Sequence, residues 1–154
     1  MSETMATEIV QETTVGAPRE RVFRALTDAR ELERWFPSRA ESDPRPGGGF
    51  HYSWEFPDAP EKDHVQKGAY ASVEPGRRVA YPWSVGGTPT DVDFTLENDG
   101  DGTRVRMVHG GWTPDIEGAR EQHVQGWQMF LSNLKTVLEG GSDVRASGAG
   151  MRVR

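Results

Sequence analysis

The sequence predicts an α+β domain in which one long C-terminal helix lies across a curved antiparallel sheet of about six to seven strands. From Ile116 to Glu139, apolar and aromatic residues recur at helical spacing along one broad face. A helix of that length spans about 36 Å. The preceding region, from Gly49 to His109, consists of short segments that alternate apolar with polar residues, as strands with one buried face do. Helix and sheet together would enclose a cavity.

The residues before this sheet predict one strand and two short helices. Residues 8–15 are rich in β-branched side chains, which indicates a strand that ends at Gly16. Pro18 favours the start of a first helix, because its fixed φ suits the first helical position. Asp28 can cap a second helix over residues 29–35.

The strands of the middle region are separated by turns rich in glycine, proline, asparagine and aspartate. The alternating segments cover residues 50–56, 65–73, 79–83, 92–96 and 105–109. A glycine-rich hairpin turn joins the last two, which places Asp93 or Glu97 opposite Arg106 or Arg104, depending on the register. Pro82 indicates a sheet edge or a bulge, because proline cannot donate to a strand ladder.

Length and composition bound the class of protein. The 154 residues fit one domain, with a disordered N-terminus at 1–7, a folded domain at 8–141 and a flexible tail at 142–154. The net charge of −6 argues against a nucleic-acid partner, and the absence of cysteine excludes disulfides and thiol chemistry. Because no secretion signal and no long apolar run is visible, we expect no membrane span and a cytoplasmic location.

Five short motifs occur in the order that a known family shows. They are Ala17-Pro18-Arg19-Glu20-Arg21-Val22-Phe23-Arg24-Ala25-Leu26-Thr27-Asp28, Arg34-Trp35-Phe36-Pro37, Gly47-Gly48, Val73-Glu74-Pro75-Gly76-Arg77-Arg78-Val79 and His123-Val124-Gln125-Gly126-Trp127. With them the chain resembles the START/Bet v 1-like (SRPBCC) superfamily over about residues 8–141. Within it, the chain is similar to the C-terminal domain of the activator of Hsp90 ATPase. The resemblance implies a helix-grip fold with a cavity, and it implies no particular reaction.

Aromatic residues with polar tips gather on the predicted inward faces. Any one of them can be a core residue, but the resembled fold usually keeps a cavity, and such rings suit its walls. We therefore expect a cavity of about a few hundred Å³ or more. The expected ligand-binding residues are Trp35, Tyr52, Trp54, Tyr70, Tyr81, Trp83, Phe94, Met107, His109, Trp112, His123, Trp127 and Phe130.

Two of the four histidines are expected at the mouth of this cavity. His109 has inward parity on the last strand, and His123 lies one helical turn before Trp127. The alternative for His123 is a structural histidine bonded to a neighbouring backbone or hydroxyl group. His51 has outward parity and His64 ends a polar loop, so both are expected in solvent. Without cysteine or a His-Glu-x-x-His segment we expect no metal site, and no motif indicates a cofactor.

Three functions fit these residues. The first is binding of a small apolar or aromatic molecule in the cavity. The second is an enzyme similar to the polyketide cyclases and aromatases of the superfamily, in which His109, His123 or Tyr52 would move a proton. The third is an interaction module, such as an Hsp90-type co-chaperone or a stress-response module. Because no nucleophile, metal cluster or cofactor motif is visible, the sequence favours binding without catalysis and assigns no catalytic residue; a homodimer is left open.

Two residues of the long helix carry further expectations. Gly126 stands inside the helix, where glycine costs about 1 kcal/mol relative to alanine. We expect it to let the helix approach the sheet or a ligand closely. Trp127 is expected to anchor the helix, with its ring against Phe94 or Met107 and partial access to the cavity.

Overall fold

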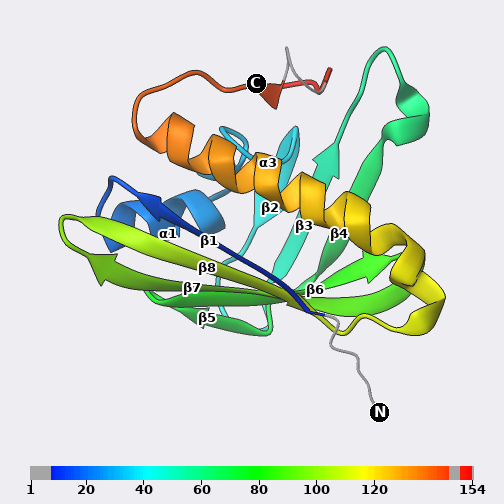
Figure 1. Cartoon of the computed structure of the whole chain (residues 1–154), viewed down its shortest axis with the longest axis horizontal. Helices are drawn as coiled ribbons and strands as arrows, with labels where there is room; N and C mark the ends of the chain where they lie inside the picture. Colours follow the sequence, from blue (N-terminus) through cyan, green and yellow to red (C-terminus); the bar gives the residue numbers. More distant parts are fainter. Residues whose placement is uncertain (1–7, 146–149, 154) are drawn as a thin grey trace.

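The structure, a computed structural model, describes residues 8–145 and 150–153 and confirms the predicted α+β helix-grip fold. Figure 1 shows α3, the long C-terminal helix, running across the strands. Two short 3₁₀ helices precede β4 and α3, at Pro60–Lys62 and Pro114–Ala119. In chain order the other elements are β1 (Ile9–Val15), α1 (Arg19–Thr27), α2 (Ala29–Leu32), β2 (Arg39–Ser42), β3 (Gly49–Trp54), β4 (His64–Ala69), β5 (Ser72–Glu74), β6 (Arg78–Val85), β7 (Thr88–Asp99), β8 (Gly102–Gly110) and α3 (Arg120–Leu138).

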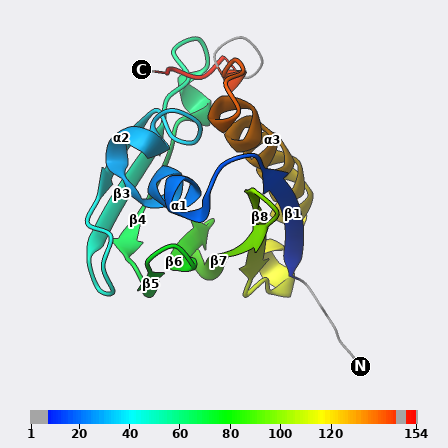
Figure 2. The ribbon, with the colours of Figure 1, turned by 90° about the vertical axis from the view of Figure 1, so that its left-hand side faces the viewer.

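The strands form two antiparallel sheets. One has five strands in the order β1-β8-β7-β6-β5, and the other has three in the order β2-β3-β4. Figure 2 shows the two sheets as one curved trough, from β1 and β8 at one side to β3 and β2 at the other. In the same view α1 lies within the trough and α3 lies along its open side. The buried faces of strands and helices therefore point toward a common interior.

The sheets meet where the predicted strand of residues 65–73 divides into β4 and β5. The edge of β6 that faces β4 carries Pro82, which has no N–H to donate to a neighbouring strand. The side chain of Gln66 bonds this edge instead: its Oε1 accepts from the Ser84 N–H, and its Nε2 donates to the Ser84 carbonyl oxygen, both at 2.8 Å. The Gln66 amide thus hydrogen-bonds β4 to β6, and Pro82 marks a strand edge, one of the two predicted alternatives.

A side-chain cap begins α2, and a 3₁₀ helix precedes α3. Asp28 caps α2 as predicted, because its carboxylate accepts from the Glu31 N–H at 3.2 Å. At its C-terminal end α2 continues only as turns, and the indole N–H of Trp35 donates to the Ala25 carbonyl oxygen at 2.7 Å. The long helix begins at Arg120, one turn later than predicted, because the residues from Pro114 form a 3₁₀ helix.

Charged side chains on the outer face of the larger sheet confirm the predicted hairpin. Glu97 and Arg104 are directly opposite in the β7–β8 register and form a salt bridge. Asp93 instead pairs with Arg78 of β6, whose Nη2 lies 2.7 Å from Oδ2 of the carboxylate. The register therefore assigns Glu97 to the hairpin and Asp93 to the neighbouring strand.

The segment that follows α3 packs against the N-terminal helical region. The fully buried guanidinium of Arg145 donates to the carbonyl oxygens of Pro37 at 2.7 Å and Glu33 at 2.6 Å. The same group pairs with Asp143, whose carboxylate also accepts from Asn133 of α3 at 3.0 Å. Flexibility of residues 142–154 stays a prediction, but these contacts hold the start of that segment against the domain.

Candidate functional site

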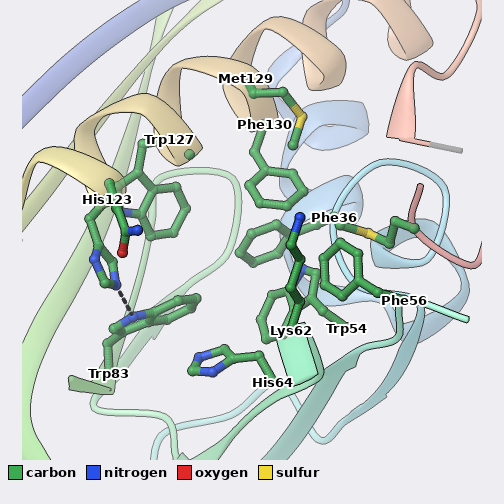
Figure 3. Close-up of a pocket in the computed structure, with 13 residues that line it drawn as sticks. Phe36, Trp54, Phe56, Lys62, His64, Trp83, His123, Trp127, Met129 and Phe130 are labelled. Carbon is green, nitrogen blue, oxygen red and sulfur yellow. Dashed lines mark hydrogen bonds between the residues drawn. The ribbon is translucent and has the colours of Figure 1, made fainter. Parts of the chain in front are cut away.

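A pocket of about 330 Å³ opens between α3 and the strands β3, β4 and β6 (Figure 3). It lies at the end of the trough where the three-stranded sheet faces the middle of the helix. Its lining is mainly aromatic and apolar. The lining residues are Phe36, Trp54, Phe56, Lys62, His64, Trp83, Gln122, His123, Gly126, Trp127, Met129, Phe130 and Met151.

Phe36 connects the walls of the pocket. Its ring centroid lies 5.1 Å from that of Trp54, 5.6 Å from that of Trp127 and 4.9 Å from that of Phe130. Trp83 stacks against it at 6.2 Å. Phe36 is buried because the turn after α2 directs it inward, with its N–H bonded to the Leu32 carbonyl oxygen. These rings form a rigid aromatic surface contributed by four separate parts of the chain.

Met151, from the C-terminal residues, supplies one wall of the pocket. Its side chain is buried, and its N–H donates to the Arg145 carbonyl oxygen at 3.1 Å. The next residue, Arg152, donates from its backbone N–H to the Glu55 carbonyl oxygen at 2.7 Å and pairs with the Glu55 carboxylate at 2.9 Å. The end of the described chain is therefore tied to the strand end beside the pocket.

His109, predicted at the cavity mouth, is fully buried, and both of its ring nitrogens have partners. The Thr90 hydroxyl donates to the Trp83 carbonyl oxygen, so it can only accept from His109 Nε2, at 2.7 Å. Nδ1 accepts from the indole N–H of Trp127 at 3.1 Å. Burial, aided by the nearby His123, lowers the pKa of His109 to about 3. His109 is therefore a neutral core residue that does not line the pocket.

His123 does line the pocket, but its ring nitrogens are also occupied. Nδ1 lies 2.9 Å from the carbonyl oxygen of Ala119, which can only accept, so Nδ1 carries the proton. Nε2 accepts from the indole N–H of Trp83 at 3.3 Å, the dashed line in Figure 3. This is the structural histidine that the sequence left as an alternative.

His64 is exposed, as the sequence predicted, and it also lines the pocket, which the sequence did not predict. It is the first residue of β4, and its ring lies 5.6 Å from the Trp54 ring and 6.1 Å from the Trp83 ring. Partial burial between these rings, aided by His123, lowers the pKa of His64. The sequence prediction did not account for the shape of the loop before His64. This loop turns back on itself, because the Asp63 carboxylate accepts from the Phe56 N–H at 2.8 Å.

Two of the predicted tyrosines, Tyr52 and Tyr70, form a hydrogen-bond chain with Ser42 within the core. The Ser42 hydroxyl donates to the Thr27 carbonyl oxygen, accepts from the Tyr70 hydroxyl and so orients the whole chain. The Tyr70 hydroxyl in turn accepts from Tyr52 at 2.6 Å. Burial raises the pKa of Tyr52 well above its ordinary value. These hydroxyl groups serve one another and do not line the pocket.

The structure thus divides the predicted ligand-binding set. Five of its members line the pocket: Trp54, Trp83, His123, Trp127 and Phe130. The remaining eight pack elsewhere in the core: Trp35, Tyr52, Tyr70, Tyr81, Phe94, Met107, His109 and Trp112. Sequence reasoning missed Phe36, Phe56, Lys62, His64, Gln122, Gly126, Met129 and Met151. Parity along a strand identifies the inward face, but it does not tell a filled part of the interior from an open one.

The two expectations for α3 have different outcomes. Trp127 is buried, and its ring packs against Phe94 at 5.9 Å, as predicted. The predicted close approach of Gly126 to the sheet is wrong, because a Cβ added there meets no heavy atom within 4 Å, and a close approach to a ligand stays a prediction. Gly126 instead lines the pocket, where the missing side chain leaves open space.

Neither a metal cluster nor a membrane helix is present in the described part of the chain. Over residues 8–145 and 150–153, no group of three His, Asp or Glu side chains is placed to hold a metal ion. None of the helices in these residues has the length and apolar character needed to cross a membrane.

Comparison with known proteins identifies the family. Residues 16–139 match the family described as activator of Hsp90 ATPase homolog 1-like protein. The chain belongs to this family. The match covers the region from the end of β1 to the end of α3, including α1, α2 and α3. No protein with a curated description matches the chain.

Solved structures support the fold assignment. The chain is 27% identical to protein MLL2253 from Mesorhizobium loti, with a TM-score of 0.75 over 86% of this chain and 96% of that one. It is 26% identical to protein CV1439 from Chromobacterium violaceum, with a TM-score of 0.75 over 87% and 99% of the two chains. The Aha1 dimer from Colwellia psychrerythraea has the same fold at 20% identity, with a TM-score of 0.74 over 89% and 99%.

Proposed function

We propose that this protein binds a small apolar or aromatic molecule in the pocket beneath α3. The observation that carries the proposal is the pocket itself, about 330 Å³ of space with walls of Phe36, Trp54, Trp83, Trp127 and Phe130. Its volume is at the lower end of the range of about 300–1,000 Å³ for ligand sites, which favours a compact ring system. Because the walls are formed in the free protein, a ligand would bind with little ordering of side chains.

The enzyme alternative receives less support from the geometry. Proton transfer needs a group that reaches the substrate and titrates near the working pH. His109 is buried with both nitrogens bonded, Tyr52 donates within the core, and His123 is bonded at both nitrogens. We therefore propose binding without catalysis by these three residues. Turnover of a polyketide-like substrate that His109→Gln or His123→Gln abolishes would contradict this view.

Gly126→Leu tests the binding proposal without removing any existing contact. The new side chain would project into the open space of the pocket, so ligand should be excluded while the fold is kept. Leucine has a higher helix propensity than glycine by somewhat less than about 1 kcal/mol, so the free energy of unfolding should stay equal or rise. Gln125→Leu, on the exposed face of the same helix, is the matched control.

The measurement is titration with prodan, an uncharged naphthalene dye whose emission reports an apolar environment. We expect saturable binding to the wild-type protein and to Gln125→Leu, and at least about tenfold weaker binding to Gly126→Leu, equal to about 1.4 kcal/mol. Equal affinity for all three proteins would place the dye outside the pocket. Absence of binding to the wild type, together with no co-purified small molecule in native mass spectrometry, would remove the proposal.

The partner predictions remain proposals as well. The Colwellia protein is described as a dimer, and this chain resembles it in fold. Sedimentation of the purified chain over a range of concentrations would decide whether it forms a homodimer.

A further inference from the structure

The side chains that line the pocket include a lysine but no carboxylate. Its polar lining residues are Lys62, His64, Gln122 and His123, and none of the lining residues is an aspartate or a glutamate. The chain as a whole has 24 acidic against 18 basic residues, so a pocket lined by a lysine and no carboxylate differs from the rest of the molecule. A cationic ligand would find no counter-charge on these walls, whereas an anionic one would find Lys62.

The hydrogen bonds around His64 determine which of its ring nitrogens is the donor. The Gln66 side-chain oxygen accepts from the Ser84 N–H, so its nitrogen is the atom 2.8 Å from His64 Nε2. That nitrogen can only donate, and His64 Nε2 must therefore accept. The proton of the neutral ring is then on Nδ1, for which the described residues provide no partner. Gln66 is 2% exposed and bonded at both ends, so this arrangement is rigid.

Two more features place donors on the same side of the pocket. Lys62 ends the short 3₁₀ helix before β4 and has no ion-pair partner among the described residues. Lys62, Trp54 and His64 line the same pocket (Figure 3). The indole N–H of Trp54, a residue 4% exposed, is buried without a hydrogen-bond partner. Donors therefore outnumber acceptors beside the aromatic floor.

We propose that the ligand is an aromatic molecule with an acidic oxygen, a carboxylate or a phenolate, which accepts from His64 Nδ1–H and pairs with Lys62. This inference rests on the proposed function and specifies the ligand class for the same pocket. The ring system would lie among Phe36, Trp83 and Trp127, and the oxygen would lie at the β4 side. Hydrogen bonds to a charged oxygen are about twice as strong as neutral ones, so the acidic group would contribute to both affinity and orientation.

Three compounds with the same naphthalene ring test the ligand class. They are 2-naphthoate, the uncharged 2-naphthalenemethanol and 2-naphthylmethylammonium, each measured by displacement of prodan from the wild-type protein. We expect 2-naphthoate to bind at least about tenfold more tightly than the ammonium compound, with the alcohol between them. Equal affinities would overturn the acidic-oxygen proposal and leave the proposed function intact. If prodan binds but none of the three displaces it, this inference fails, whereas the proposed function fails only if prodan itself does not bind in the pocket.

Variants of the two donors test their roles. Lys62→Met and His64→Phe should each reduce the advantage of 2-naphthoate over the alcohol by about threefold or more, and leave the affinity for the alcohol nearly unchanged. The matched controls are Lys67→Met on β4 and His51→Phe on β3, which are exposed, face each other across the strands and do not line the pocket. An unchanged advantage in both donor variants would contradict the assignment.

The protonation state of His64 can be read directly by nitrogen NMR. We expect the ring of the free protein to carry its proton on Nδ1, with Nε2 unprotonated. Gln66→Glu replaces the amide donor by a carboxylate acceptor, which should raise the pKa of His64 and protonate Nε2. A wild-type ring with its proton on Nε2, or a His64 pKa that Gln66→Glu leaves unchanged, would show that Gln66 does not set the donor.

Discussion

The side chains of His109, His123 and His64 differ in how many ring nitrogens are already engaged. The first two have a protein partner at each nitrogen, while His64 has one at Nε2 only. A neutral imidazole has one donor and one acceptor, so the fully bonded rings have nothing left for a ligand. At the residue scale, hydrogen-bond direction therefore separates the structural histidines from the one that can act in the pocket.

Burial of His109 predicts a specific loss of stability in acid. Its pKa is about 3 in the folded protein, against about 6.5 in the unfolded chain. Between these values only the unfolded state binds the proton. The free energy of unfolding therefore has its full contribution from neutral His109 above about pH 6.5, and this contribution is lost as the pH falls toward 3. From pH 7 to pH 5 the free energy of unfolding should fall by about 2 kcal/mol on account of this residue.

The check is urea denaturation of the wild type and of His109→Gln at both pH values. The variant loses hydrogen bonds and should be less stable than the wild type at pH 7. Between pH 7 and pH 5, however, its free energy of unfolding should fall by about 2 kcal/mol less than that of the wild type. If both proteins lose the same amount, His109 is not the group that must remain neutral.

Among the elements, β4 and β6 are hydrogen-bonded through the side chain of Gln66. Gln66→Leu keeps the volume but removes both bonds to Ser84 and the bond to His64. We expect a loss of about 1–3 kcal/mol in the free energy of unfolding, toward the lower value because water can reach the exposed Ser84. Denaturant unfolding measures this loss, with Lys67→Leu on the same strand as the control. A loss no larger than that of the control would show that Gln66 does not join the sheets.

Periodicity explains why the elements were predictable and the pocket was less so. Alternation over residues 50–56 and helical spacing before Glu139 both identify an apolar face, and β3 and α3 follow from them. Phe36 follows a helix end, and His64 follows a polar loop, so neither belongs to a periodic pattern. The bonds of Gln66 to another strand likewise have no signature in the sequence. Residues that line the pocket from turns and strand ends could therefore be found only in three dimensions.

For the whole molecule, the C-terminal segment links the pocket to the stability of the domain. Arg145 and Asp143 connect α3 to the region after α2, and Met151 forms a pocket wall. Burial alone would raise the pKa of Asp143, but hydrogen bonds from Arg145 and Asn133 outweigh it and lower that pKa. A tail without a structural role would have no such contacts.

Deletion of residues 142–154 distinguishes a flexible tail from a structural segment. A flexible tail predicts no change in the free energy of unfolding. The contacts of Arg145 instead predict a loss of about 2–4 kcal/mol, because the hydrogen bonds of a buried guanidinium are charge-assisted and the carbonyl groups of Glu33 and Pro37 lose their donor. Removal of Met151 should in addition weaken prodan binding by opening one wall of the pocket. Denaturant unfolding and dye titration measure the two effects, and deletion of residues 1–7 serves as the control.

Because Arg145→Met breaks the ion pair but keeps Met151, it should lower stability while affecting binding less than the deletion does. An unchanged free energy of unfolding in both proteins would show that the domain ends with α3.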